Sequence, residues 1–203
     1  MIFDMTKRKG GGDAYELARK IASGTATEYI DNDITTLRGY AFAHNANLAT
    51  LKVPNVTAVN GNCINGTGIT TLILPKLTTT YGKPYSFAEA KQLKAADFSK
   101  LTNIVANVFK NNAKMDCLVI RTSSLCAGQI SAFDGTPFAS GKAGGTLYVP
   151  ASLISSYESA TNWSTILSYP NNQIKSIEST HTDPNAPVDL TLYYVDGTPI
   201  PTA

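Results

Sequence analysis

Residues 48–54 are Leu-Ala-Thr-Leu-Lys-Val-Pro, and residues 69–75 are Ile-Thr-Thr-Leu-Ile-Leu-Pro. In both stretches the first, fourth and sixth residues are apolar and the seventh is proline. Three less regular copies of the pattern follow, built on Leu93, Ala96 and Phe98, on Met115, Leu118 and Ile120, and on Leu147, Val149 and Pro150. Repetition at a nearly fixed interval predicts an array of similar structural units.

The intervals between the copies indicate the kind of array. Counted at their central residues, 51, 72, 96, 118 and 147, the copies are 21, 24, 22 and 29 residues apart. The first three intervals are typical of leucine-rich repeats. The longer fourth interval predicts an insertion within residues 121–146.

A second apolar block precedes each copy. We expect each repeat to form a coil with one short strand and one irregular return segment, and the block to supply an inward plug from the return segment. Tyr40 and Phe42 belong to the first block, and Tyr85 and Phe87 belong to the third. One coil cannot bury its apolar side alone, so neighbouring coils must stack. Because alternate residues of a strand point inward, the copies should form interior columns. The predicted fold is therefore a leucine-rich-repeat solenoid of the α+β class, in which short strands stack in a curved parallel sheet.

Helices are expected at both ends of the solenoid, where the core would otherwise be exposed. Residues 13–23 have an amphipathic pattern that begins at Asp13, and residues 151–160 have a second such pattern. Capping helices are the first interpretation, and partner-binding helices are the alternative. The predicted organisation is an N-terminal arm (1–12), an N-terminal helical cap (13–33), leucine-rich repeats (34–150), a C-terminal cap (151–179) and a C-terminal arm with a strand (180–203).

The composition favours a globular chain with an unevenly charged surface. Apolar residues make up 43% of the sequence, which is enough for a core, and no apolar run reaches the roughly 18 residues that span a bilayer. The N-terminus lacks the layout of a signal peptide, so we expect neither membrane insertion nor a secretion signal. Residues 34–150 carry eleven basic and four acidic side chains. Such a surface favours anionic glycans, wall polymers or nucleic acid, although an ordinary solvated surface explains the same charge.

The sequence contains no recognisable catalytic, cofactor-binding or metal-binding pattern. The two histidines, His44 and His181, are not spaced as metal ligands. The three cysteines, Cys63, Cys117 and Cys126, form no paired motif and are expected to be small buried apolar residues. We therefore predict a protein that is not an enzyme and has no cofactor, metal or specific nucleic-acid partner. An unrecognised enzyme stays a remote alternative, because catalytic triads are assembled in space.

The residues that point away from the core should form two ladders along the predicted sheet. One ladder contains Thr50, Thr71, Ala95, Cys117 and Thr146, and the other contains Lys52, Ile73, Asp97, Val119 and Tyr148. Solenoids commonly bind partners through such a surface. The candidate recognition surface is therefore Lys52, Asp97 and Tyr148, with an ordinary solvated face as the alternative.

Several stretches carry a resemblance to a known family. Tyr40-Ala41-Phe42 with residues 48–54, and residues 69–75, resemble the repeats of the BspA-like leucine-rich-repeat family, which pair an alanine-phenylalanine plug with a leucine-rich strand. Residues 136–138, 145–150, 156–157 and 161–164 resemble the closing unit of such proteins on bacterial surfaces and in tailed-phage virions. The resemblance covers roughly residues 13–178, although Cys63-Ile64 departs from the usual plug. It implies adhesion and recognition, and it brings neither a ligand nor catalytic residues.

The resemblance further implies a phage virion protein of the tail, baseplate or head-decoration type, which contributes to assembly or host-surface attachment. A chain without a secretion signal fits a protein that is assembled in the cell and released by lysis. Its expected partners are other virion proteins or a host cell-surface protein or glycan. The terminal arms are expected to pair within the chain or to support a homo-oligomer. A bacterial cell-surface adhesin of the BspA-like type is the alternative.

Overall fold

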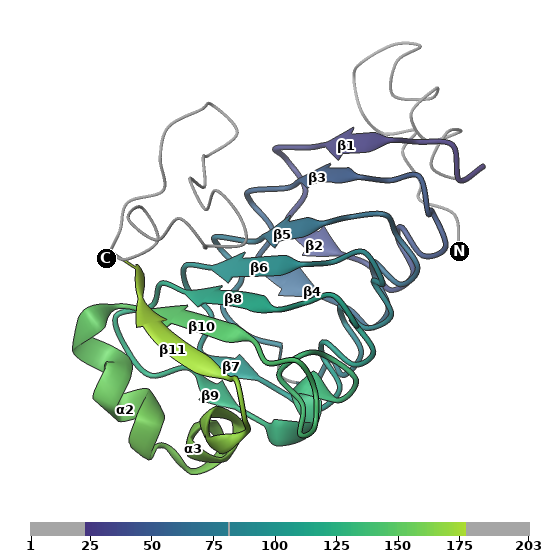
Figure 1. Ribbon diagram of the computed structural model, residues 1–203. Coiled ribbons are helices and arrows are strands. Elements are labelled where there is room, and N and C mark those ends of the chain that lie inside the picture. The colour runs from purple at the N-terminus through teal and green to yellow at the C-terminus, as the bar shows by residue number, and fades with distance from the viewer. Residues whose placement is uncertain (1–22, 81, 178–203) are drawn as a thin grey trace.

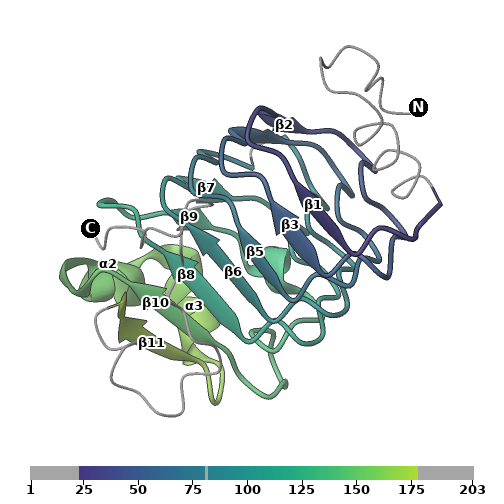
Figure 2. The ribbon, with the colours of Figure 1, turned by 90° about the horizontal axis from the view of Figure 1, so that it is seen from above.

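The structure is a computed structural model that describes residues 23–80 and 82–177. In this part of the chain, successive coils stack along one direction, and the strand of each coil lies beside that of the next (Figure 1, Figure 2). The predicted arms, residues 1–12 and 180–203, lie outside the described residues, as do residues 13–22 of the predicted N-terminal helix.

The main sheet is parallel and follows the coils in chain order. Its strands are β5 (Thr71–Ile73), β6 (Ala95–Phe98), β8 (Cys117–Ile120), β10 (Thr146–Val149) and β11 (Gln173–Ser176). Their parallel pairing and their position in successive coils are consistent with the repeat solenoid that the sequence predicts.

The sheet register aligns the central residues of the repeat copies. Leu72 pairs with Ala96, Ala96 pairs with Leu118, and Leu118 pairs with Leu147. The sequence alignment of these four copies is therefore confirmed. At the far end, Ile174 of β11 pairs with Leu147 and continues the same row.

The N-terminal boundary of the repeats differs from the prediction. The sequence predicts a helical cap over residues 13–33, but β1 (Glu28–Ile30) is a strand that pairs in parallel with β3 (Thr50–Lys52). Residues 23–33 contain no helix. The buried Tyr29 lies beside Leu51 and takes the inward position that an aliphatic residue takes in later coils. The coil of β1 therefore lacks the leucine that marks the later coils, and the leucine pattern does not predict it.

The return segments are also joined from coil to coil. Two short parallel pairs form there, β2 (Thr36–Leu37) with β4 (Ala58–Val59) and β7 (Asn103–Ile104) with β9 (Ala127–Gly128). Backbone amides next to the core donate hydrogen bonds of 3.0 Å to the following coil, from Phe42 to Cys63, from Phe87 to Val108 and from Phe109 to Ala132. Each coil is thus fixed to its neighbour on two sides.

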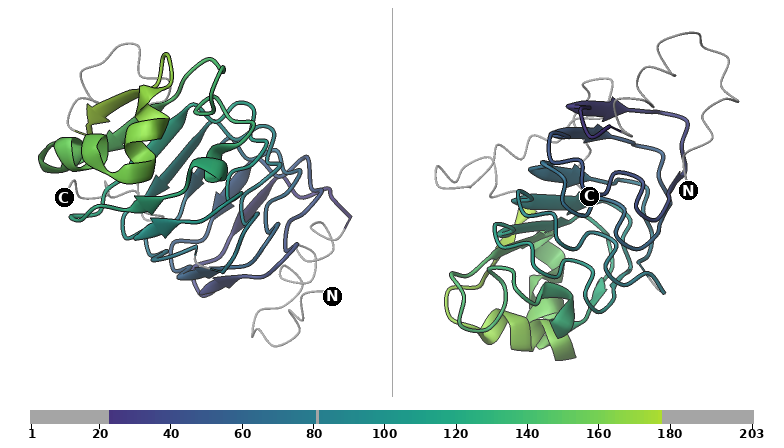
Figure 3. Two further views of the ribbon diagram at one scale, coloured as in Figure 1. Left: turned by 90° about the horizontal axis from the view of Figure 1, so that it is seen from below. Right: turned by 90° about the vertical axis from the view of Figure 1, so that its right-hand side faces the viewer.

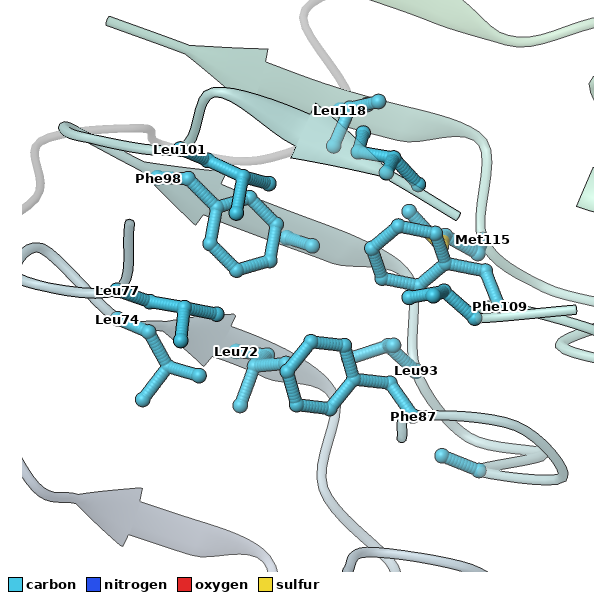
Figure 4. Packing of buried hydrophobic residues seen from close by; sticks show 14 of the residues in the cluster. Leu72, Leu74, Leu77, Phe87, Leu93, Phe98, Leu101, Phe109, Met115 and Leu118 are labelled. Atoms are coloured by element: carbon cyan, nitrogen blue, oxygen red, sulfur yellow. The ribbon is translucent and has the colours of Figure 1, made fainter. Parts of the chain in front are cut away.

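The core lies between the sheet and the return segments. Figure 4 shows leucines of the strand side, including Leu72 and Leu118, facing the phenylalanines of the return side. The return-side rings form a continuous stack, in which Phe109 lies 5.7 Å from Phe87 and 5.8 Å from Phe133 between ring centroids. All five of these side chains are buried. Leucine and phenylalanine columns therefore fill the interior together.

Helices lie at the C-terminal end of the described stack (Figure 3). They are the 3-10 helices η1 (Ile130–Phe133) and η2 (Ala151–Leu153) and the α-helices α2 (Ile154–Ser159) and α3 (Thr161–Ser168). The helix predicted over residues 151–160 corresponds to η2 and α2. The long interval between Leu118 and Leu147 accommodates η1 and the loop that follows it.

The stacked core makes Leu72→Ala strongly destabilising. We expect it to lower the free energy of unfolding by about 2–5 kcal/mol, because Leu72 is fully buried and alanine leaves a cavity between two coils. Chemical denaturation followed by circular dichroism measures the change. The matched control is Thr70→Ala, an exposed position two residues earlier, which should change stability by less than about 0.5 kcal/mol. Equal stabilities of the two variants would be inconsistent with the packed column.

Candidate functional site

The predicted recognition residues lie on the outer side of the sheet, but two of them are buried. Asp97 and Tyr148 occupy the same row of the register, joined through Val119 of β8. Lys52 of β3 is exposed, whereas Asp97 is 1% exposed and Tyr148 is fully buried. The prediction that all three form one solvent-facing surface is therefore wrong. Of the three, only Lys52 is accessible to a partner. A role in recognition stays a prediction.

Tyr148 is buried because the outer face carries a second apolar cluster. The cluster comprises Ala95, Cys117, Val119, Tyr148 and Ile177. All four residues of β8 are buried, so this strand is covered on both faces. A continuous apolar run of this kind is typical of a strand that is buried on both sides. The run Cys-Leu-Val-Ile at residues 117–120 was the sequence signal for this covered face.

Asp97 can be buried because it forms an ion pair with Arg121, a residue that the sequence analysis does not identify. Arg121 Nε donates hydrogen bonds to both carboxylate oxygens of Asp97, at 3.1 and 3.0 Å, and both side chains are almost fully buried. Burial raises the pKa of Asp97 to about 7, and the charge of Arg121 opposes this rise. A buried carboxylate needs such a partner, so the pair is best explained as part of the structure.

The three cysteines are buried, as the sequence predicts. Burial raises the pKa of each thiol, of Cys63, Cys117 and Cys126, to about 12. The Cys63 thiol also donates a hydrogen bond to the Ser86 carbonyl at 3.0 Å. Because the thiolate is the reactive form of cysteine, these three side chains lack the properties of nucleophiles.

Thiol accessibility provides a direct check of this burial. In the native protein at pH 8, we expect a water-soluble aromatic disulfide reagent to release almost no coloured thiolate, because all three sulfur atoms are buried. In concentrated guanidinium chloride, all three cysteines should react. Absorbance measured over time gives both results. One equivalent released rapidly from the native protein would contradict the described packing.

Clusters of metal-ligating side chains and membrane-spanning helices were sought among the described residues. Within residues 23–80 and 82–177, no three histidine, cysteine or acidic side chains gather in a way that could hold a metal ion. His44 is exposed in this part of the chain, and His181 lies outside it. No helix of the described residues is both long enough and apolar enough to cross a bilayer.

Tyr40 and Tyr85 are accessible aromatic residues of the return segments. Each belongs to an apolar block from which the sequence predicts one inward plug, but Tyr40 is 66% exposed and Tyr85 is 38% exposed. Phe42 and Phe87, two residues later in each coil, plug the core instead. The blocks alone do not show which aromatic side chain points inward, because the return segments are irregular in structure.

Comparison with known proteins identifies the repeats. The family model described as the BspA type leucine rich repeat region matches residues 24–137 in six copies. The match covers 114 of the 203 residues, and it begins ahead of β1. Neither a curated protein nor a solved structure matches the chain.

Proposed function

The chain belongs to the BspA type leucine-rich-repeat family, and we propose that it is a non-catalytic protein that acts by adhesion or protein binding. The observation that carries this proposal is the stack of matched repeats. Stacked coils repeat equivalent residues at a regular distance and so create long surfaces suited to extended partners. The buried, high-pKa thiols agree with this assignment, because they are packed as core residues.

Within this role, we propose that the chain is a phage virion protein involved in assembly or host-surface attachment. Support comes from the resemblance of the C-terminal unit to virion proteins of this family. The aromatic residues of this unit, Phe138, Tyr157 and Trp163, pack in one group with Phe133: the Phe133 ring lies 5.3 Å from that of Phe138 and 5.7 Å from that of Trp163, and the Trp163 ring lies 5.4 Å from that of Tyr157. We infer that α2 and α3 close the core at this end of the solenoid.

The partners proposed for this role are other virion proteins or a host cell-surface protein or glycan, and the assembly state proposed is a homo-oligomer. Antibodies raised against the chain provide the localisation test. The virion proposal expects the antigen to copurify with particles through a density gradient at constant stoichiometry. Antigen found only in the cell envelope would instead favour a bacterial surface adhesin. Antigen restricted to the soluble cell fraction would argue against both locations.

Binding itself is tested with the fluorescently labelled full chain on intact bacterial cells. Saturable binding that unlabelled chain displaces is the expected result for an adhesion protein. Lys52→Ala tests the outer sheet face, because truncation of the buried Asp97 or Tyr148 would also perturb folding. Lys91→Ala, at an exposed turn, is the matched control. Equal, non-saturable adsorption of parent and unrelated protein would exclude a specific adhesion role on these cells.

A further inference from the structure

One edge of the solenoid turns through equivalent residues in an unusual backbone conformation. Tyr40, Asn62, Tyr85 and Asn107 have φ angles of 58°, 57°, 62° and 62°. They lie 22, 23 and 22 residues apart, one in each successive coil. The Asn62 amide donates to the Tyr85 carbonyl at 2.8 Å, so these corners lie beside one another. The edge therefore alternates tyrosine with asparagine.

The two tyrosines are costly residues at these corners. Asparagine tolerates the left-handed region because its short polar side chain bonds locally, whereas a bulky side chain there is strained. Burial does not offset the strain, since Tyr40 is 66% exposed and Tyr85 is 38% exposed. Residues with strained backbone angles cluster at functional sites in proteins.

A basic residue accompanies each tyrosine. Arg38 precedes Tyr40 by two residues and Lys83 precedes Tyr85 by two residues, and all four side chains are exposed. The equivalent positions of the two coils with asparagine corners are Asn60 and Val105. Within residues 23–80 and 82–177, neither Arg38 nor Lys83 forms an ion pair. The edge thus repeats an accessible cation and an accessible aromatic ring every two coils.

Further contacts hold the rings beside polar groups. The Asn62 side-chain amide donates to the Tyr40 hydroxyl at 3.3 Å, which ties that ring to the next coil. The Lys110 ammonium lies over one face of the Tyr85 ring, 5.9 Å from its centroid, which leaves the other face for a ligand. Each tyrosine is therefore bordered by a hydrogen-bond donor from the following coil.

The spacing of the tyrosines selects a ligand geometry. Hydrogen-bonded neighbouring strands lie about 4.7–4.9 Å apart, so residues two coils apart are separated by about 10 Å. This distance is close to the disaccharide repeat of an extended β-1,4-linked polysaccharide, in which every second sugar presents the same face. An aromatic ring stacks on the apolar face of a sugar, and a nearby cation attracts a carboxylate.

We propose that the edge formed by Arg38, Tyr40, Lys83 and Tyr85 binds a β-1,4-linked polysaccharide that carries one carboxylate in each disaccharide repeat. Alternate sugars stack on the two tyrosines, and the carboxylates meet the arginine and the lysine. This proposal names the ligand class for the adhesion role proposed above and rests on that role.

Calorimetric titration of the full chain with three hexasaccharides tests the proposal. The probes are a peptide-free peptidoglycan strand, which is β-1,4-linked with a carboxylate on every second sugar, neutral chitohexaose, and α-1,4-linked maltohexaose. We expect the acidic probe to bind most tightly, chitohexaose more weakly, and maltohexaose not at all. Equal binding of maltohexaose would overturn the spacing argument. Failure of all three sugars to bind would overturn the glycan assignment. The adhesion role is tested separately, because saturable binding of the chain to cells would support it even if no sugar binds.

Variants at the edge separate binding from folding. Tyr40→Asn with Tyr85→Asn introduces the residue that Asn62 and Asn107 already place at these corners, so the thermal unfolding temperature should stay the same or rise. Loss of two stacking contacts should weaken binding of the acidic hexasaccharide about tenfold or more. Arg38→Gln with Lys83→Gln should weaken binding of the acidic hexasaccharide and leave binding of chitohexaose unchanged. Leu125→Asn, which removes an exposed apolar residue elsewhere, is the control. Undiminished affinity of the double-tyrosine variant would overturn the assigned surface.

Discussion

Replacing Trp163 with alanine is expected to lower the free energy of unfolding by about 3–5 kcal/mol. Trp163 is 1% exposed and lies at the contact between α3 and the last coils. Its ring centroid is 5.7 Å from that of Phe133 and 5.4 Å from that of Tyr157. The indole Nε1 also donates a hydrogen bond to the Cys126 carbonyl at 2.7 Å. The substitution therefore creates a cavity and leaves a buried carbonyl without its donor.

The measurement is denaturation followed by far-ultraviolet circular dichroism, because Trp163 is the only tryptophan of the chain and its fluorescence is lost in the variant. Trp163→Phe retains part of the ring packing without the hydrogen bond and should give an intermediate loss. Glu158→Ala, an exposed position on α2, is the control with little expected change. A loss below about 1 kcal/mol for the alanine variant would show that α3 does not cover the core as described.

Arg121→Ala should produce a loss of similar size, about 3–5 kcal/mol near neutral pH. The substitution leaves the buried Asp97 carboxylate without the guanidinium that donates hydrogen bonds to it at 3.0–3.1 Å and balances its charge. Replacing both partners with apolar residues, as in Asp97→Leu with Arg121→Met, should recover most of the loss, because no charge then remains buried. A double variant no more stable than Arg121→Ala would contradict this reasoning.

The pH dependence of the same variant follows from the pKa of Asp97. Burial raises the folded-state pKa of this carboxyl to about 7, above the value of about 4 that it has when unfolded. A raised folded-state pKa means that the fold is favoured when the group is protonated, and this contribution is lost as pH rises from about 4 to about 7. Arg121 lowers the pKa of Asp97, so its removal leaves the folded-state pKa still higher. The Arg121→Ala loss should therefore be larger at pH 8, where the wild-type carboxyl is ionised, than at pH 5, where it is protonated in both proteins. Equal losses at the two pH values would indicate that Asp97 is solvated.

The interior of the repeats could be predicted from the sequence because burial on the inner face is repeated in every coil. Leu72, Leu118 and Leu147 each supply the same inward position, and the sheet register aligns them through Ala96. The coil of β1 was not predicted because Tyr29, not leucine, occupies its inward position. A period of leucines detects the coils that use leucine, whereas the packing requires only an apolar side chain of suitable volume.

The surface could not be predicted as well, because it depends on contacts between coils and on backbone angles. Asp97 and Arg121 are separated by 24 residues, and their pairing follows only once the register of β6 and β8 is known. The outward direction of Tyr40 and Tyr85 depends on positive φ angles that an aromatic residue rarely adopts. Sequence periodicity carries no information on either feature.

Every functional inference depends on the stacking of the coils into one body, and native-state hydrogen exchange tests this most directly. The amides of Phe42, Phe87 and Phe109 donate hydrogen bonds to the carbonyls of neighbouring coils within the core. We expect these amides to be strongly protected, with Phe87 and Phe109 exchanging only through opening of the whole stack. Exchange of the Phe87 and Phe109 amides at the rates of an unfolded chain would contradict the stacked solenoid.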